Sequence, residues 1–265
     1  MLKKALALAL ALIIIFPLLY AVSLSLFAPR DFNASPARFF PEKPMFENYM
    51  KAIGHSYFLR YTMNSLITAL LASLIRTLIV LLSSYAFSFL HFRGKKAILF
   101  FLLLSAFIPQ DSLLYENYVT AARLNLLNTY MGIIVTSLFS ATQLMMLMTA
   151  MKSLSKDTFD AARVDGANDI TVLFHIIAPL TKSIIITIFL QSFIGVFNAY
   201  LWPLLVTNTA EMRTIQIGIS LMGYQESGRM GPLFATLLLV LIPFVILTVA
   251  TKKLIIKALA DGLSY

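Results

Sequence analysis

Residues 62–90 read TMNSLITALLASLIRTLIVLLSSYAFSFL, and this stretch decides the fold. It is apolar almost throughout, and its one charged side chain is Arg76. A run of about 20 apolar residues is long enough to cross the hydrocarbon core of a bilayer as an α-helix. Because lipid offers no hydrogen-bond partner for backbone N–H and C=O groups, a helix is the structure in which such a run can span. The stretch therefore predicts a transmembrane helix.

Further apolar segments of similar length stand before and after this one, and none alternates apolar and polar residues with the period of two that a barrel strand requires. The first segment exceeds the roughly 7–15 apolar residues of a cleaved secretory signal, so we expect it to be retained. The sequence predicts an all-α polytopic membrane protein, one transmembrane domain over residues 1–265 with six transmembrane helices. The expected spans are about residues 5–28, 62–90, 97–121, 130–151, 183–207 and 231–256.

The composition of the whole chain agrees with this fold class. Of the 265 residues, 59% are apolar and 12% are charged, and the mean hydropathy is +0.84. A soluble domain carries roughly 25% charged residues, so a water-soluble globule and a disordered chain are both excluded. The chain has no cysteine, and its three histidines are far apart, which excludes disulfides, thiolate ligands and a zinc site.

The net charge of +9 is explained by membrane topology rather than by nucleic-acid binding, because the basic residues flank the apolar segments. If the N-terminus is cytoplasmic, twelve Lys and Arg residues fall on its side and eight on the other. The positive-inside rule then places both termini in the cytoplasm. The polar, proline-containing segment 29–61 lies outside and is expected to form a cap or a partner-docking loop.

The cytoplasmic segment 152–182 differs from the other connections, because it is too polar to span and too long for a simple turn. N-cap residues at its start predict a short helix over about 156–164, and Gly166 is suited to ending that helix. A second helical piece is expected from Asp169, with an acidic cap, to near Pro179. The segment therefore predicts helix, glycine turn and helix on the cytoplasmic face, a protrusion able to transmit force from a soluble partner.

Asp160-Ala161-Ala162, Gly166, Ile176 and Pro179 stand at the spacing E-A-A-x3-G-x9-I-x-L-P. This pattern resembles the signature loop of the permease subunits of bacterial ABC importers, with Asp160 in place of Glu and Ala178 in place of Leu. The alternative is an amphipathic interfacial helix that contains Ala-Ala and Gly. The resemblance implies a coupling helix that docks on an ATPase subunit through Asp160, Ala161, Ala162, Asp165, Gly166, Ile176 and Pro179.

Residues 198–204, NAYLWPL, resemble the W-N-x4-P-L segment of carbohydrate-importer permeases, with Phe197 where that branch has Trp. Asn64-Ser65 and the segments 124–130 and 212–214 are similar to the same branch. The resemblance covers nearly the whole chain. It is closest to the maltose-transporter type, and to the shorter of the two permeases of such systems.

Four residues of this segment are candidates for lining the solute pathway, because amide and aromatic side chains suit the hydroxyls and ring faces of a sugar. The alternative is structural, with an interhelical hydrogen bond from the Asn and packing or interfacial anchoring by the aromatic rings. The candidates are Asn198, Tyr200, Trp202 and Pro203.

The resemblance implies half of the translocation pore of an ATP-driven importer in the bacterial inner membrane, for a sugar or oligosaccharide. The implied partners are a second permease that completes a heterodimer, two ATPase subunits, an extracytoplasmic substrate-binding protein and membrane lipid. The chain has no Walker A motif, nucleophile elbow or HExxH motif, so we expect no catalytic residue, no metal and no bound cofactor. ATP and Mg²⁺ are expected on the partner ATPase.

Other readings of the polar residues remain open. Arg76 lies within a span, where a cation costs about 2.5 kcal/mol or more, and is a candidate for an intramembrane ion pair or for snorkelling. A glycerol 3-phosphate importer would use cations such as Arg76, Arg123 or Arg213. A secondary transporter or channel would use intramembrane carboxylates, for which Asp111 and Glu116 are the nearest candidates. A membrane-embedded enzyme is disfavoured, since no His/Asp/Glu cluster is present.

Overall fold

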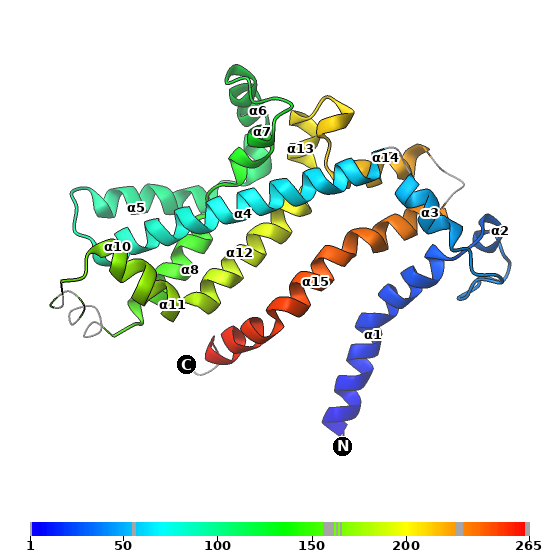
Figure 1. Ribbon diagram of the computed structural model, residues 1–265, viewed down its shortest axis with the longest axis horizontal. Helices are drawn as coiled ribbons and strands as arrows, with labels where there is room; N and C mark the ends of the chain where they lie inside the picture. The colour runs from blue at the N-terminus through cyan, green and yellow to red at the C-terminus, as the bar shows by residue number, and fades with distance from the viewer. Residues whose placement is uncertain are drawn as a thin grey trace. The chain divides into compact units, whose positions relative to one another are not determined.

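The computed structural model describes residues 2–54, 57–155, 162, 164, 166–225 and 230–262. Regular structure in these residues is helical, with no β-strand, which confirms the predicted all-α class (Figure 1). The chain divides into two compact units. The first unit is Met1–Asn64 with Arg213–Thr248, and the second is Ser65–Met212 with Val249–Tyr265.

The first unit contains α1 (Leu2–Ser25), α2 (Pro29–Phe32), α3 (Glu47–Gly54), α14 (Ile215–Gln225) and the beginning of α15 (Met230–Gly262). The end of α1 is tied to α3 by Asn48, a buried side chain whose Nδ2 donates to the carbonyls of Ser25 and Phe27 at 2.9 Å each. The last carbonyls of a helix have no partner within it, so a side-chain donor is needed at this point.

Two helices are long and apolar enough to cross a membrane among the described residues. They are α4 (Phe58–Phe89) and Met230–Lys252 within α15. Both coincide with stretches that the sequence predicts as spans. The apolar part of α1, Leu10–Ser25, is shorter, and its Ile13 and Ile14 side chains are 68% and 72% exposed.

The apolar segment 97–121, expected as one helix, is interrupted in the middle. It forms α5 (Lys95–Leu104), the short 3-10 helices η1 (Ser105–Phe107) and η2 (Gln110–Leu113), and α6 (Leu114–Arg123). Ile108 at the break is extended, with φ −89° and ψ 117°. It precedes Pro109, and a proline disfavours helical backbone at the residue before it and donates no hydrogen bond itself.

The segments 130–151 and 183–207 are interrupted as well. The first forms α7 (Tyr130–Ile134), η3 (Val135–Ser137) and α8 (Ala141–Lys152), with a bend of 56° before α8. The second forms α12 (Lys182–Phe197) and α13 (Leu201–Val206). A bend of 83° separates α12 from the helical stretch Asp169–Leu180. If each of these two bent pairs is one span, the described residues contain up to four candidate spans.

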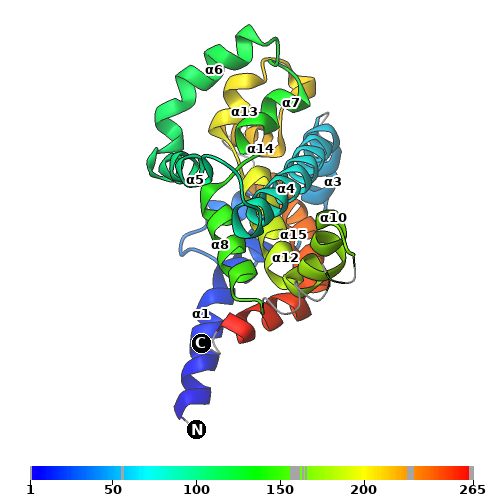
Figure 2. The same cartoon turned by 90° about the vertical axis from the view of Figure 1, so that its left-hand side faces the viewer.

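The core of the second unit joins α4, α8, α12 and the π-helical turn η4 (Val172–Ile177), which the two views show side by side (Figures 1 and 2). Between apolar helices in lipid, association depends on close packing rather than on exclusion of water, and small residues allow it. The buried face of α4 has this character. It includes Ser65, Thr68, Ala69, Ala72, Ser73 and Ser84, each at most 1% exposed.

Candidate functional site

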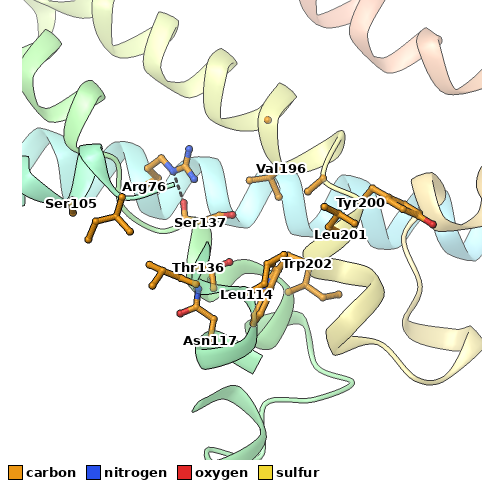
Figure 3. Close-up of a pocket in the computed structure, with 15 residues that line it drawn as sticks. Arg76, Ser105, Leu114, Asn117, Thr136, Ser137, Val196, Tyr200, Leu201 and Trp202 are labelled. Atoms are coloured by element: carbon orange, nitrogen blue, oxygen red, sulfur yellow. Dashed lines mark hydrogen bonds between the residues drawn. The ribbon is translucent and has the colours of Figure 1, made fainter. Parts of the chain in front are cut away.

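A cavity of about 670 Å³ lies within the second unit (Figure 3). Its lining comes from α4, α6, α7, α12 and α13 and from all three interruptions of the apolar segments. Irregular backbone at membrane depth is tolerated where it is buried in protein or lines a cavity. The position of the three breaks in the cavity lining is consistent with this rule. The breaks contribute Ser105 and Ile108, Thr136 and Ser137, and Ala199 and Tyr200.

Arg76 is the one charged side chain among the described residues of this lining, and it comes from the middle of α4. Its side chain is half-buried, and its Nε donates a hydrogen bond to the carbonyl oxygen of Ser137 (Figure 3). Ser137 ends η3, where the interrupted helix leaves carbonyls without their usual partner. Among the described residues no carboxylate pairs with Arg76, so the ion pair considered for it has no partner in this part of the chain.

Trp202 supports the opposite side of the lining. It is buried in α13, and its indole N–H donates to the carbonyl oxygen of Gly132 in α7 at 3.0 Å. A Cβ at Gly132 would clash with the carbonyl of Leu126, so only glycine permits the close approach of Leu126 to α7. The hydrogen bond joins two segments that are 70 residues apart in the sequence.

The four predicted pathway residues separate into two pairs. Tyr200 and Trp202 line the cavity together with Arg76. Asn198 is an exposed residue at the C-cap of α12, and Pro203 is buried in α13, and neither belongs to the lining. The remaining polar lining comes from Ser105, Asn117, Thr136 and Ser137, which the sequence analysis did not select.

The described part of the predicted coupling segment contains the helical stretch Asp169–Leu180. Asp160, Ala161 and Asp165 lie outside the described residues. Gly166 has φ +84°, a left-handed conformation that suits the predicted turn. The second helix begins at Asp169 as predicted. Its N-cap, however, is Asn168, whose side-chain oxygen accepts a hydrogen bond from the Thr171 N–H at 2.8 Å. An N-cap residue has extended backbone, which lets its side-chain oxygen reach the free N–H groups of the first turn.

The helical stretch ends near Pro179, as the sequence predicts. Pro179 lies in α11 (Ala178–Leu180), and the helix ends at Thr181. A proline has no N–H to donate to the residue four before it, and the turn that precedes Pro179 is the π-helix η4. Ile176 and Ala162 are partly buried and pack against the core cluster that joins α4, α8, η4 and α12.

A polar contact that the sequence analysis missed links the predicted coupling segment to α4. The Tyr85 hydroxyl lies 2.7 Å from Oδ1 of Asp169, while the Tyr85 ring is buried in the core. Buried tyrosine hydroxyls usually find a hydrogen-bond partner. A tyrosine among the Leu and Ser residues of a predicted span was therefore the available signal that α4 makes a polar contact here.

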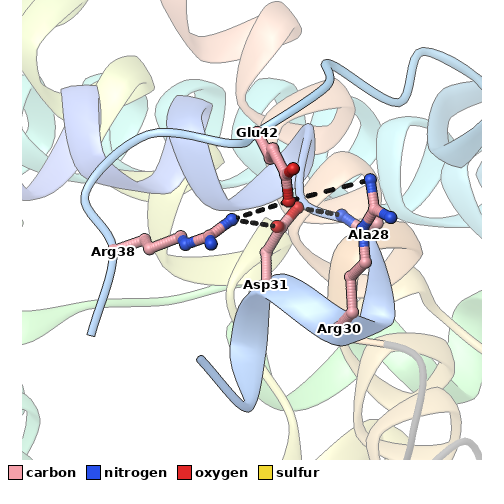
Figure 4. A network of polar contacts seen from close by, with 5 residues as sticks. All are labelled: Ala28, Arg30, Asp31, Arg38 and Glu42. Atoms are coloured by element: carbon pink, nitrogen blue, oxygen red, sulfur yellow. Dashed lines mark hydrogen bonds and ion pairs between the residues drawn. The ribbon is translucent and has the colours of Figure 1, made fainter. Parts of the chain in front are cut away.

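A network of charged residues lies in the first unit, within the predicted outer segment (Figure 4). The buried Asp31 carboxylate accepts from the Ala28 N–H at 2.9 Å and from Arg38 at 3.3 Å. Arg38 also donates to Glu42 at 2.9 Å, and Arg30 lies 3.8 Å from Glu42. The hydrogen bond from Arg38 and the charge of Arg30 hold the pKa of Glu42 below its ordinary value, and the same hydrogen bond raises the pKa of Arg38.

Long apolar helices, interrupted spans and a polar cavity built at the interruptions define a membrane transport protein. The chain matches, over residues 5–260, the family of binding-protein-dependent transport system inner membrane components. It belongs to this family, and the resemblance to ABC importer permeases drawn from its motifs is confirmed.

Several relatives match nearly the full length of the chain. The trehalose/maltose transport system permease protein MalG of Thermococcus litoralis is 30% identical over 97% of this chain and 93% of its own length. The sn-glycerol-3-phosphate transport system permease protein UgpE of Yersinia pestis is 28% identical, with coverages of 95% and 92%. The sulfoquinovosyl glycerol transport system permease protein SmoH of Agrobacterium fabrum is 26% identical, with coverages of 94% and 88%.

Two solved structures share the fold. One is a bacterial ABC transporter involved in the import of the acidic polysaccharide alginate, with a TM-score of 0.83 and 20% identity over 95% of this chain and 94% of that chain. The other is a bacterial alginate ABC transporter in complex with its alginate pentasaccharide-bound periplasmic protein, with a TM-score of 0.67, 16% identity and coverages of 96% and 95%.

Proposed function

We propose that this chain forms half of the translocation pore of an ATP-driven importer, for a sugar, an oligosaccharide or a related small polyol. The observation that carries the proposal is the family match over residues 5–260, because it spans both the cavity and the predicted coupling segment. Permeases for trehalose and maltose, glycerol 3-phosphate and sulfoquinovosyl glycerol are among the relatives. The solute is delivered by an extracytoplasmic binding protein, and a second permease completes the pore.

The proposed topology is a single permease domain over residues 1–265 with six spans and both termini in the cytoplasm. Two of the spans correspond to α4 and α15, which are long enough to cross unaided. The interrupted segments cross as bent or broken spans around the cavity. This arrangement is supported by the location of the three breaks in the cavity lining, where a membrane protein tolerates irregular backbone.

The proposed mechanism is alternating access driven from the cytoplasmic side. ATP and Mg²⁺ bind to the partner ATPases, and the segment 152–182 rides on one of them. Packing of Ala162 and Ile176 on the core of the second unit, and the Tyr85–Asp169 hydrogen bond, support transfer of its movement to α4. The ATPase then selects between two helix packings because it binds one better than the other. This chain itself supplies no catalytic residue.

A secondary transporter or channel is the competing class, and it would function without ATPase subunits, a second permease or a binding protein. Its coupling carboxylate would have to be buried within a span. The Glu116 side chain is exposed on α6, which does not favour that role.

Co-purification separates the two classes. The chain is tagged at its N-terminus, native membranes are solubilised gently, and the companions are identified by mass spectrometry. We expect a stoichiometric ATPase and a second permease, and ATP hydrolysis by the recovered assembly that rises with the loaded binding protein. Recovery of this chain alone or as a homo-oligomer, under conditions in which a control importer stays intact, would reject the importer.

A further inference from the structure

Among the residues whose side chains the structure describes, the cavity lining contains one cation and no carboxylate. Arg76 is its charged member, and its other members are polar but neutral or apolar. We propose that this cavity binds an anionic group of the transported solute, a carboxylate, phosphate or sulfonate, with Arg76 as the counter-charge. The inference rests on the proposed function, because it assigns a charge class to the solute that the pore carries.

The Arg76 guanidinium is oriented and still has donors to offer. One of its five N–H donors, on Nε, is bound to the Ser137 carbonyl. Its two terminal nitrogens have no hydrogen-bond or ion-pair partner among the residues that the structure describes. Such a fork, fixed at one edge and open at the other, is suited to bidentate contact with a carboxylate, phosphate or sulfonate.

The rest of the lining suits the neutral part of a small polyhydroxylated molecule. Asn117 and Thr136 make no side-chain hydrogen bond within the described ranges, so their donors and acceptors are available to solute hydroxyls. Trp202 adds an aromatic side chain on which an apolar ring face can pack. All of these side chains are gathered around one space (Figure 3).

The size of the cavity favours a whole solute over a single side chain from a neighbouring subunit. Its volume of about 670 Å³ lies within the range of roughly 300–1,000 Å³ that is usual for small-molecule sites. One inserted carboxylate would leave most of this polar volume unfilled. A counter-charge stabilises a cation in the middle of a span. A solute anion would supply this charge, and its neutral part would contact the remaining polar groups.

The test measures binding to the assembled importer in phosphatidylcholine nanodiscs without its binding protein, which has a specificity of its own. The probes are two matched pairs, galacturonate with galactose and glycerol 3-phosphate with glycerol. The signal is the fluorescence of Trp202, the one tryptophan of this chain, taken as the difference from an assembly that carries Trp202→Phe. Arg76→Gln and Arg76→Lys are compared with Arg93→Gln, which removes an exposed cation in the turn before α5.

We expect at least one acidic probe to bind about tenfold to a hundredfold more tightly than its neutral partner, as for hydrogen bonds to a charged group. Arg76→Gln should abolish this preference, Arg76→Lys should retain part of it, and Arg93→Gln should leave it unchanged. The preference should also decline as salt is added.

Three outcomes would overturn the inference. The first is equal affinity for the acidic and the neutral probe of each pair, or no binding of either, or a preference for the acidic probe that survives Arg76→Gln. The second is a Trp202 signal produced by phosphatidylglycerol nanodiscs without solute, which would identify a lipid headgroup as the anion. The third is loss of the second permease from the Arg76→Gln assembly while the parent shows no preference, which would identify a partner carboxylate. In each case the co-purification result would still stand, so the importer assignment is decided separately.

Discussion

Several polar side chains of this protein meet needs of the backbone. Arg76 donates to Ser137, Trp202 to Gly132, and Asn48 to the end of α1, each at a place where a helix stops. A hydrogen bond contributes a net of only about 0.5–1.5 kcal/mol in water. An unsatisfied carbonyl in a bilayer costs several kcal/mol, and that penalty decides these contacts. A donor that also lines a cavity, as Arg76 does, therefore combines a structural role with the proposed binding role.

The Tyr85 hydroxyl should matter for coupling more than for folding. Tyr85→Phe keeps the buried ring and removes the 2.7 Å hydrogen bond to Asp169. A hydrogen bond to a charged group contributes roughly 1.5–3 kcal/mol, so we expect the solute transported per ATP hydrolysed to decrease about tenfold or more. Both rates are measured in proteoliposomes. Tyr115→Phe, which changes a side chain that is 73% exposed, is the matched control, and equal ratios in the two variants would contradict the coupling role.

Glu42 should make the outer network sensitive to acid. Its pKa is held below the ordinary value of 4.5 by Arg38 and Arg30, so the ionised form is favoured in the folded protein. The stability that it contributes is present above pH 4.5 and is lost as the pH falls through the lowered folded-state value. Proteolysis of the segment 29–46 in the parent protein should therefore accelerate as the pH falls below 4.5.

Glu42→Gln isolates this effect from the titration of other groups. The variant should be cleaved faster than the parent at neutral pH, and its rate should lack the parent's acid-dependent increase. Glu47→Gln removes a carboxylate of another exposed ion pair, with Lys51, and serves as the control. A parent and a Glu42→Gln variant with the same pH profile would show that the network does not depend on Glu42.

At the scale of elements, the sequence predicts where the helices are apolar but not where they break. Hydropathy identified the segment that became α4, since a long run with one charge has a single solution in lipid. It did not predict the interruption at 138–140, because apolar content is unchanged there and the stop depends on the Ser140 cap and on tertiary packing. The break before Pro109 had a local signal, the proline itself.

The cavity could not be predicted because it is assembled from those breaks. Tyr200 and Trp202 were selected through a resemblance, and Arg76 through the anomaly of a cation within a span. Asn117 and Thr136 have no comparable signal in the sequence, and only the fold brings them to the same cavity as Arg76. The Tyr85–Asp169 contact, between residues 84 positions apart, was hidden from the sequence for the same reason.

The turn at Gly166 offers a prediction for the coupling segment. Its φ of +84° is strained for a residue with a Cβ, although no atom of the described residues lies within 4 Å of the Cβ position. Gly166→Ala should therefore disturb the backbone without a steric clash, at roughly 1–2 kcal/mol, and lower solute transport several-fold. Gly166→Asn is the control, since Asn tolerates left-handed backbone better. Transport is measured at equal amounts of inserted protein. Equal loss in both variants would point to a role of the surface rather than of the turn.

At the scale of the whole molecule, one helix connects the proposed coupling and binding sites. Tyr85 and Arg76 are nine positions apart on α4, or about 13 Å along a helix that rises about 1.5 Å per residue. In the proposed mechanism, α4 would be the rigid element through which motion of the segment 152–182 reaches the cavity. Coupling free energies are reciprocal, so occupancy of the cavity must in turn affect how the ATPase binds the segment.

Topology is the property on which both sites depend, and the absence of cysteine makes it directly measurable. Single cysteines are introduced at Phe40, which is 79% exposed in the outer segment, at the exposed His91 in the turn before α5, and at Ile14 on the apolar surface of α1. A membrane-impermeant maleimide is applied to spheroplasts before and after permeabilisation. We expect Phe40→Cys to react in both, His91→Cys to react only after permeabilisation, and Ile14→Cys to stay unreacted in lipid. Labelling of His91→Cys from outside would invert the proposed orientation, and the segment 152–182 would then face away from the ATP that must drive it.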